Sequence, residues 1–459
     1  MGQAVLKLTL SSRGWSGGGN NELEASMAKL AIEGGEKEVT LSPPNWPQVG
    51  EEEIEAVVAA LRKSAEDWEY LCSARGGGPT AEFERTFAEF MGAEYGLCTC
   101  GGGPALHVAV MAAGVESGDE VIVSPYTWGQ TVSCILQQNA IPVFADIDLR
   151  TYNLDPKSVE ERISPYTKAL VVVHIYGHPA DMDALNAVAE KHGLLVIEDC
   201  AQATGAKYKG RRVGTLGHLG CFSIGDGKQI IGGEGGVLLT NDCDLFEEAL
   251  MFGQHPLRQS WQVENEERKK WMDSLIYTYR IHPLAAVIAG VQLRYLDQWN
   301  AERRANYELL SEGLKDVPGI EPVYVAPDCE HVYHIYSPTF VPEEVEGISR
   351  DTYIEALQAE GVPIGHGYVR TPIHLRPRMQ EKRWFFGRGY PWAAGRREIV
   401  YRPGDCPVAE HRCAETELTL GGGPRWRGDQ SALVRQILNA FHKVAENLDV
   451  LRRRERDLR

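Results

Sequence analysis

The chain has 459 residues, of which 47 are Lys or Arg and 64 are Asp or Glu, so its formal net charge is −17. A chain this acidic is a poor general binder of nucleic acid, because like charge opposes its approach to phosphate. Glycine contributes 48 residues without a G-X-Y period, and hydrophobic residues make up an ordinary 43%, so collagen-like and mostly disordered chains are excluded.

Length, cysteine spacing and hydropathy set further bounds. A chain of this length predicts two to three structural units. The ten cysteines contain no C-x-x-C pair, so we predict neither a zinc knuckle nor a thioredoxin-type site, and we assign no metal ligand. No apolar run approaches the roughly 18 residues of a membrane helix, and the first residues lack a signal-peptide layout. We therefore expect a soluble protein in a reducing, cytoplasmic setting.

The first half of the chain changes from an irregular arm to alternating strands and helices. Residues 1–40 are predicted to be an irregular N-terminal arm, followed by amphipathic helices at 51–64 and 79–92. The pattern next predicts strands at 119–123, 141–145, 169–175 and 194–198, with helices at 128–139 and 181–192. Such alternation predicts an α/β fold with a mainly parallel sheet and helices on both faces.

The second half predicts a smaller unit. One long helix is expected over 284–310, followed by helices at 350–361 and 430–450 and by short strands. These patterns divide the chain into three parts. They are the arm at 1–40, a large α/β domain at 41–295 and a small C-terminal α+β domain at 296–459.

Polar residues follow the predicted strands where ligands bind such sheets. Asp199 comes directly after the strand at 194–198, and Lys228 follows 29 residues later between glycine turns. This pair suits pyridoxal phosphate, because a lysine amine bonds to the cofactor aldehyde and an aspartate keeps the pyridine nitrogen protonated. Ser223 can donate its hydroxyl to the phosphate. The glycines at 101–103 precede a predicted helix, whose free N–H groups form an anion site.

Taken in order, these motifs resemble the DegT/DnrJ/EryC1/StrS family of fold-type I pyridoxal-phosphate sugar aminotransferases. The resemblance covers roughly residues 41–450. The matching segments are residues 124–128, 174–182, 198–202, 222–223 with Lys228, 233–236, 279–280, 285–286, 292–293 and 372–375. It implies the family's fold, a mainly parallel sheet of the seven-stranded type with a smaller C-terminal domain.

The resemblance also implies roles for individual residues. Lys228 is then the Schiff-base lysine, which moves the proton between the amino-acid Cα and the cofactor. Asp199 binds the pyridine nitrogen, Gln202 lies by the phenolic oxygen of the ring, and Trp128 stacks on the ring face. Lys228 further favours transamination, because related dehydratases have histidine at this position.

The remaining roles concern the phosphate and the substrate. Ser223 and the amides of Gly102 and Gly103 are expected to hold the phosphate. His374 and Tyr368 are expected to lie near the substrate. The resemblance implies a homodimer in which Thr278 completes the active site of the neighbouring chain.

Two positions depart from the family pattern. Gly103 replaces a threonine, which removes one phosphate-binding hydroxyl. Thr278 replaces an asparagine, whose reach is longer. Both changes bear on the affinity for the cofactor rather than on its identity.

The reaction that we predict moves an amino group from Glu or Gln to a keto-cyclitol or keto-sugar, in secondary-metabolite or amino-sugar biosynthesis. The segment 222–228 and the Cys-Pro-Val-Ala-Glu run at 406–410 resemble the branch that acts on cyclitols and aminohydroxybenzoate precursors. Two alternatives stay open. One is a pyridoxal-phosphate lyase or elimination enzyme of the same fold, and the other is a non-catalytic descendant, against which the intact Lys228 argues.

Overall fold

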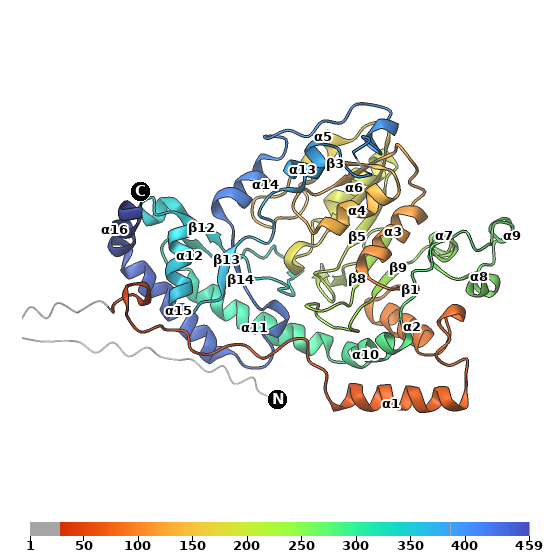
Figure 1. Cartoon of the computed structure of the whole chain (residues 1–459), viewed down its shortest axis with the longest axis horizontal. Helices are drawn as coiled ribbons and strands as arrows, with labels where there is room; N and C mark the ends of the chain where they lie inside the picture. The colour runs from red at the N-terminus through yellow and green to blue at the C-terminus, as the bar shows by residue number, and fades with distance from the viewer. Residues whose placement is uncertain (1–27, 386, 459) are drawn as a thin grey trace, which may run out of the picture.

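The computed structural model describes residues 28–385 and 387–458, and its centre is a mainly parallel sheet, as the sequence predicts (Figure 1). Residues 1–27 of the predicted arm lie outside the described residues. Within the described chain the sheet has seven strands in the order β1-β9-β8-β5-β4-β2-β3. Their bounds are β1 Tyr95–Thr99, β9 Gly236–Thr240, β8 Leu219–Ser223, β5 Leu195–Asp199, β4 Thr167–Val173, β2 Glu120–Val123 and β3 Ile141–Phe144.

Strand direction brings the polar strand ends to one edge of the sheet. The strands β8, β5, β4, β2 and β3 pair in parallel, whereas β9 runs antiparallel to both β8 and β1. Asp199 pairs in register with Val173 on one side and with Cys221 on the other. The carboxyl ends of three neighbouring strands therefore meet beside Asp199.

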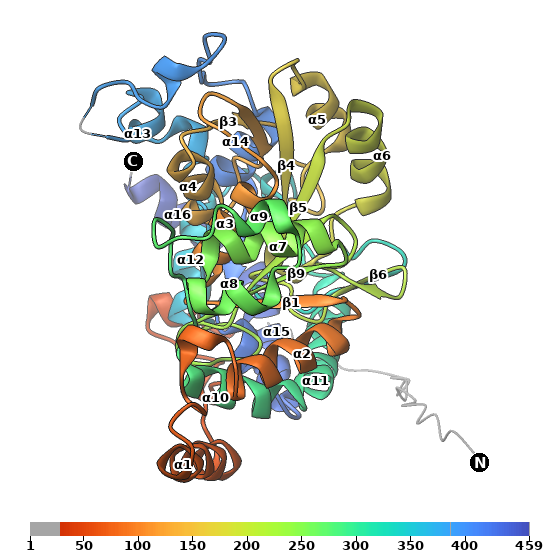
Figure 2. The same cartoon turned by 90° about the vertical axis from the view of Figure 1, so that its right-hand side faces the viewer.

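Helices cover both faces of the sheet (Figure 2). Because β-α-β crossovers are right-handed, α4 covers one face and α5 and α6 cover the other. The helix α3 packs against α4 and α7, whereas α2 packs against β1 and α10. The bounds are α2 Pro79–Met91, α3 Gly102–Ala112, α4 Gly129–Gln137, α5 Pro156–Arg162, α6 Met182–His192, α7 Cys243–Gly253 and α10 Pro283–Leu293.

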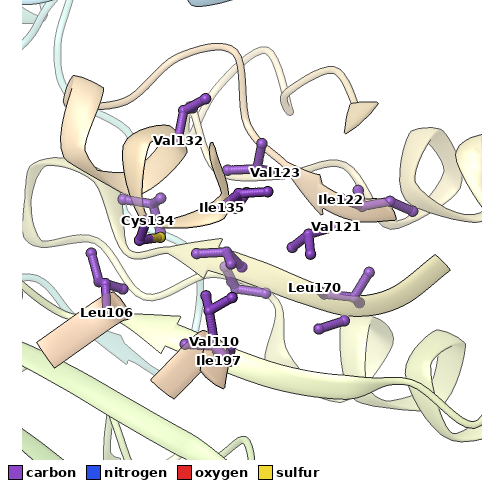
Figure 3. Close-up of a cluster of buried hydrophobic side chains, with 14 of the residues drawn as sticks. Leu106, Val110, Val121, Ile122, Val123, Val132, Cys134, Ile135, Leu170 and Ile197 are labelled. Atoms are coloured by element: carbon purple, nitrogen blue, oxygen red, sulfur yellow. The ribbon is translucent and has the colours of Figure 1, made fainter. Parts of the chain in front are cut away.

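The interior between the sheet and these helices is apolar. Figure 3 shows Leu106 and Val110 of α3 and Ile135 of α4 near Leu170 of β4 and Ile197 of β5. All five side chains are buried. The strand β4 reads as a nearly continuous apolar run because it is covered on both faces.

The C-terminal part has its own apolar cluster and its own short sheets. Its elements are α11 Leu296–Leu314, β10 Ile320–Glu321, β12 Thr339–Phe340, α12 Arg350–Ala359, β13 Ile364–His366, β14 Leu418–Leu420, α15 Ser431–Glu446 and α16 Leu448–Leu458. Residues 28–40 pack onto this part, where Leu30 and Val39 are buried. The buried Glu360 accepts hydrogen bonds from Ala31 N at 2.8 Å and from Lys443 Nζ at 3.0 Å.

Two long helices that the sequence predicts are each divided in the structure. The helix expected over 284–310 is α10 followed by α11, with a break at Arg294 and Tyr295. The break lies where the packing partner changes, because α10 packs on α1 and α2 whereas α11 packs on α15. The helix expected at 430–450 likewise becomes α15 and α16.

Shorter elements complete the chain. They are α1 Glu51–Glu66, β6 Lys207–Tyr208, β7 Arg211–Arg212, α8 Pro256–Gln262, α9 Glu266–Lys269, β11 Cys329–Glu330, α13 Pro377–Gln380 and α14 Pro407–His411. Figure 1 shows α8 and α9 projecting from one side of the molecule. Within the described residues, no helix combines the length and the apolar character needed to cross a membrane.

We expect the buried ion pair between Arg258 of α8 and Glu84 of α2 to hold this projecting segment to α2. The guanidinium donates to both carboxylate oxygens, at 2.9 and 2.7 Å, and Arg258 is only 1% exposed. Arg258→Met should lower the free energy of unfolding in urea by about 3–5 kcal/mol, because it leaves a buried carboxylate without its partner. Arg85→Ala, which removes an exposed pair with Glu89, serves as control and should cost at most about 0.5 kcal/mol. Equal effects would contradict the assignment.

Candidate active site

A cavity lies at the carboxyl edge of the central sheet, where parallel sheets bind their ligands. Its volume is about 340 Å³, within the range of small-molecule sites. The lining comes from the starts of α3 and α4, the ends of β5 and β8, the loop after β8 and the C-terminal part. It consists of Gly102, Gly103, Leu106, Thr127, Trp128, Gln130, Thr131, Val173, Asp199, Ala201, Gln202, Ser223, Gly225, Asp226, Gly227, Lys228, Glu234, His334 and Tyr368.

Asp199, the last residue of β5, is buried in the wall of this cavity. Thr131 Oγ1 donates to its Oδ2 at 2.8 Å, and the Ala201 N–H donates to its Oδ1 at 3.1 Å. Burial raises the pKa of Asp199, whereas these two hydrogen bonds and the positive charge of Lys228 act in the opposite direction. The carboxyl is thus fixed by two donors, and its ionisation responds to any cation placed beside it.

The neighbouring Glu198 fixes the end of β5 through hydrogen bonds. Backbone N–H groups at residues 214, 216 and 217 donate to its carboxylate at 2.6–2.7 Å, and His174 Nε2 lies 2.9 Å from Oε2. His174 Nδ1 accepts from the Ala180 N–H at 3.0 Å, which leaves the proton on Nε2 for Glu198. Although Cys200 also lies close, the acceptor atoms are filled by protein donors, and we assign this cluster a structural role.

Lys228 reaches the same cavity from the loop between β8 and β9. Burial lowers the pKa of its amine, and the carboxylates of Asp199 and Asp226 oppose that shift. The ring of His334 lines the cavity nearby, and the charge of Lys228 adds to the burial that lowers the pKa of this histidine. The cavity therefore holds an amine that loses its proton more readily than an exposed lysine does.

One end of the cavity has the features of an anion site. The helix α3 begins at Gly102 without a side-chain cap, so its first N–H groups are free to bind a ligand. A Cβ atom at Gly102 would lie 2.8 Å from Cβ of Ser223, which explains why glycine is needed there. Ser223 Oγ accepts from the Gly225 N–H at 3.4 Å, which leaves its own hydrogen available to a ligand.

Two aromatic side chains form another wall of the cavity. The rings of Trp128 and Tyr368 lie 6.1 Å apart at 30°, and Trp128 is 60% exposed. Gln202 Oε1 accepts from the Tyr176 N–H at 2.7 Å, and the side chain of Gln202 also hydrogen-bonds to Tyr368 beside the cavity. Burial raises the pKa of Tyr368, so its hydroxyl keeps its proton.

Two residues that the sequence points to do not line this cavity. His374 is buried against a separate cavity of about 410 Å³, and its Nε2 lies 3.0 Å from Glu410 Oε1. Thr278 is exposed in the segment that precedes α10. The substrate contact expected for His374 and the partner contact expected for Thr278 therefore stay predictions.

Four residues of functional interest were missed at the level of sequence. Thr131 holds Asp199, and its spacing of four from Thr127, to which it lies hydrogen-bonded at 2.9 Å, was a usable signal. His334 and Gln130 line the cavity without any motif of their own. Glu417 comes from a distant segment, and nothing local marks it.

Glu417 is a buried carboxyl behind the aromatic wall. The hydroxyls of Tyr126 and Tyr176 both donate to its Oε1, and the Tyr368 N–H donates to the same oxygen at 3.3 Å. Gly367 leaves the space for this carboxyl, because a Cβ there would overlap Oε2. Burial raises the pKa of Glu417 to about 7. Glu417 therefore joins the C-terminal part to two strand ends of the sheet.

Comparison with known proteins places this geometry in context. The family model of the DegT/DnrJ/EryC1/StrS aminotransferase family matches residues 63–386. An L-glutamine:2-deoxy-scyllo-inosose aminotransferase from Streptoalloteichus tenebrarius is 39% identical over 300 residues, which cover 64% of this chain and 69% of that protein. A dTDP-3-amino-3,4,6-trideoxy-alpha-D-glucose transaminase from Streptomyces venezuelae is 34% identical over 393 residues, which cover 85% of this chain and 92% of that protein.

A solved structure agrees with these relatives. The aminotransferase from Psychrobacter cryohalolentis superposes with a TM-score of 0.76 at 28% identity, over 89% of this chain and 100% of that one. The family model matches residues 63–386, and all residues that line the cavity, from Gly102 to Tyr368, lie within that range. The likeness therefore extends to the whole cavity.

The raised pKa of Glu417 predicts a distinctive pH dependence of stability. Between pH 4.5 and about 7 the native carboxyl keeps its proton while the unfolded one loses it, so this contribution to stability is lost as the pH rises. Relative to Glu417→Gln, the wild-type free energy of unfolding should fall by up to about 3 kcal/mol across this range, at about 1.4 kcal/mol per unit.

Urea unfolding of both proteins at several pH values measures this difference. The comparison with Glu417→Gln removes the contributions of other groups that titrate in the same range, including the buried histidines. A difference that does not vary with pH would contradict the raised pKa.

Proposed function

The chain belongs to the DegT/DnrJ/EryC1/StrS aminotransferase family, as its motifs predicted, and we propose that it moves an amino group from glutamate or glutamine to a keto-cyclitol or keto-sugar. Enzymes of this family are transaminases that use pyridoxal phosphate. The observation that carries the proposal is the joint placement of Lys228 and Asp199 in one cavity with an anion site at its end.

The donors in the cavity fit the cofactor. Pyridoxal phosphate supplies an aldehyde that bonds to amines and a pyridinium ring that accepts the electrons of a carbanion. A cavity of about 340 Å³ combines a lysine, a carboxylate and an uncapped helix start. We assign the phosphate to Ser223 and the N–H groups of Gly102 and Gly103, because these are neutral donors grouped at one end.

Asp199 would hold the proton on the ring nitrogen. A protonated nitrogen beside the carboxylate would favour its ionised form, as the hydrogen bonds from Thr131 and Ala201 already do. Without those donors the buried carboxyl would tend to take up the proton itself. Thr131 is therefore a positioning residue in this proposal.

Lys228 would bind the cofactor through its amine and would move the proton at the α-carbon of the amino donor. Burial lowers the pKa of this amine, which increases the neutral fraction that can act as a base. Asp199 and Asp226 keep the shift from becoming larger. An amine with a lowered pKa can both take up and return a proton.

The rest of the lining would orient the ring and the substrate. Trp128 provides a flat face for the ring, and the amide of Gln202 lines the cavity as a donor for the phenolic oxygen. Tyr368, which keeps its hydroxyl proton, stands at the wall expected to contact the substrate. His374 lines a separate cavity. Its predicted contact with the substrate therefore requires a rearrangement of the chain or a substrate that reaches that second cavity.

A homodimer with shared active sites is the second part of the proposal. The segment from α8 to the start of α10 projects from the body (Figure 1). Its apolar side chains are unusually exposed, with Trp271 at 76% and Leu275 at 89%. Such side chains in a projecting segment that also carries Thr278 favour contact with a second copy of the chain.

The amino-transfer proposal is tested by the absorption of the purified holoenzyme. Addition of glutamate or glutamine should abolish the visible band of the lysine-bound cofactor and raise the near-ultraviolet band of its aminated form. A keto-cyclitol or keto-sugar should then restore the visible band. Lys228→Ala should lack that band and should not respond to either amino acid.

Three outcomes would count against this proposal. Absence of any spectral change with all amino donors would exclude transamination. Steady release of ammonia and an oxo acid without a keto acceptor would favour an elimination enzyme instead. A visible band that persists in Lys228→Ala would mean that another lysine binds the cofactor.

The dimer is tested by sedimentation velocity. The wild-type protein should sediment at twice the chain mass of 50.8 kDa. Leu275→Asp should shift it toward the monomer and lower its cofactor content, because a charge would enter the contact. Leu309→Asp, at an exposed position of α11, serves as control and should leave both unchanged. A fully active monomer would contradict the shared site.

A further inference from the structure

The space beside Gly103 is filled by another residue. A Cβ atom at Gly103 would lie 3.1 Å from Cδ, 3.2 Å from Oε1 and 3.3 Å from Nε2 of Gln130. The amide of Gln130 therefore occupies the volume into which a side chain at position 103 would extend. Gly103 and Gln130 come from the first turns of two different helices, α3 and α4.

The side-chain amide of Gln130 has no hydrogen-bond partner within the described part of the chain. Gln130 lines the cavity together with Gly102, Gly103 and Ser223. Within residues 28–385 and 387–458, its side-chain amide makes no hydrogen bond. An amide nitrogen carries two donor hydrogens, and this one stands beside the free N–H groups at the start of α3.

The lining contains few positively charged side chains, so its neutral hydrogen-bond donors matter more for binding an anion. Among the described lining residues there is no arginine, and Lys228 is the one lysine. That lysine is committed to the aldehyde end of the cofactor in the proposed function. A phosphate at the start of α3 would thus be held by hydrogen-bond donors and helix ends rather than by a full positive charge.

We propose that Gln130 binds the phosphate of the cofactor through its side-chain amide, and that Gly103 is glycine because this amide needs the space. The inference rests on the assignment of this end of the cavity to the phosphate. It gives the chain a donor in place of the hydroxyl that Gly103 lacks. Gln130 would thereby act as a cofactor-binding residue drawn from α4 instead of α3.

Cofactor affinity measures this role without any turnover. The apoenzyme is titrated with pyridoxal phosphate and, separately, with pyridoxal, which lacks the phosphate. Gln130→Ala should weaken the binding of pyridoxal phosphate by about tenfold, the usual effect of one hydrogen bond to a charged group. It should leave the affinity for pyridoxal unchanged.

A matched control stands on the same helix. Gln137 is the exposed last residue of α4, outside the cavity, so Gln137→Ala removes the same side chain without touching the lining. This variant should bind both probes as the wild type does. An equal loss with Gln130→Ala and Gln137→Ala would show only a weakened helix.

A double variant tests the spatial relation between the two residues. Gly103→Thr alone should weaken the binding of pyridoxal phosphate, because its Cβ would displace the Gln130 amide. Combined with Gln130→Ala, the threonine gains space and supplies a hydroxyl donor. The double variant should therefore bind pyridoxal phosphate better than either single variant, a non-additive result that independent sites would not give.

Several results would overturn the inference. They are an unchanged affinity for pyridoxal phosphate in Gln130→Ala, an equal loss for both probes, and additive effects in the double variant. An increased KM for the keto substrate with unchanged cofactor affinity would assign Gln130 to the substrate. Failure of the wild-type apoenzyme to bind pyridoxal phosphate would instead contradict the proposed function.

Discussion

The burial of a carboxyl and an amine in one cavity is the constraint on which the rest of this structure depends. Removal from water disfavours the charged form of each group, so burial raises the pKa of Asp199 and lowers that of Lys228. Their mutual attraction opposes both shifts, and the hydrogen bond from Thr131 opposes the shift of Asp199. Burial thus favours the neutral form of each group, whereas the attraction between the two groups favours their charged forms.

These opposed effects depend on the position of the Asp199 carboxyl, which the fold fixes. Asp199 is the last residue of a central strand, and the adjacent Glu198 fixes that strand end through three backbone N–H groups and His174. Glu417 likewise fixes part of the cavity wall, because it links the hydroxyl of Tyr176 to the backbone of Tyr368. The wall of the cavity that comes from the C-terminal part is thus tied to the strands that carry the charged pair.

The sequence predicted those features that local patterns determine. The parallel sheet followed from alternating strands and helices, and Asp199 with Lys228 followed from motif order and strand-end position. Features that arise from contact between distant segments were not accessible. The break between α10 and α11 reflects a change of packing partner, and Glu417 meets Tyr126 across 291 residues of chain. His374 has a suitable motif, but the fold directs its ring to a different cavity.

In the proposed assignment of the phosphate, neutral donors serve a site built around one lysine. An arginine at this end would add a positive charge to the cavity, and like charge lowers the pKa of a neighbouring amine further. Helix starts and amide groups bring only partial charges that act at short range. In that arrangement burial, Asp199 and Asp226 set the proton affinity of Lys228, while the phosphate would be held separately. The missing side chain at Gly103 is then consistent with a site that gains a donor from α4 without gaining a charge.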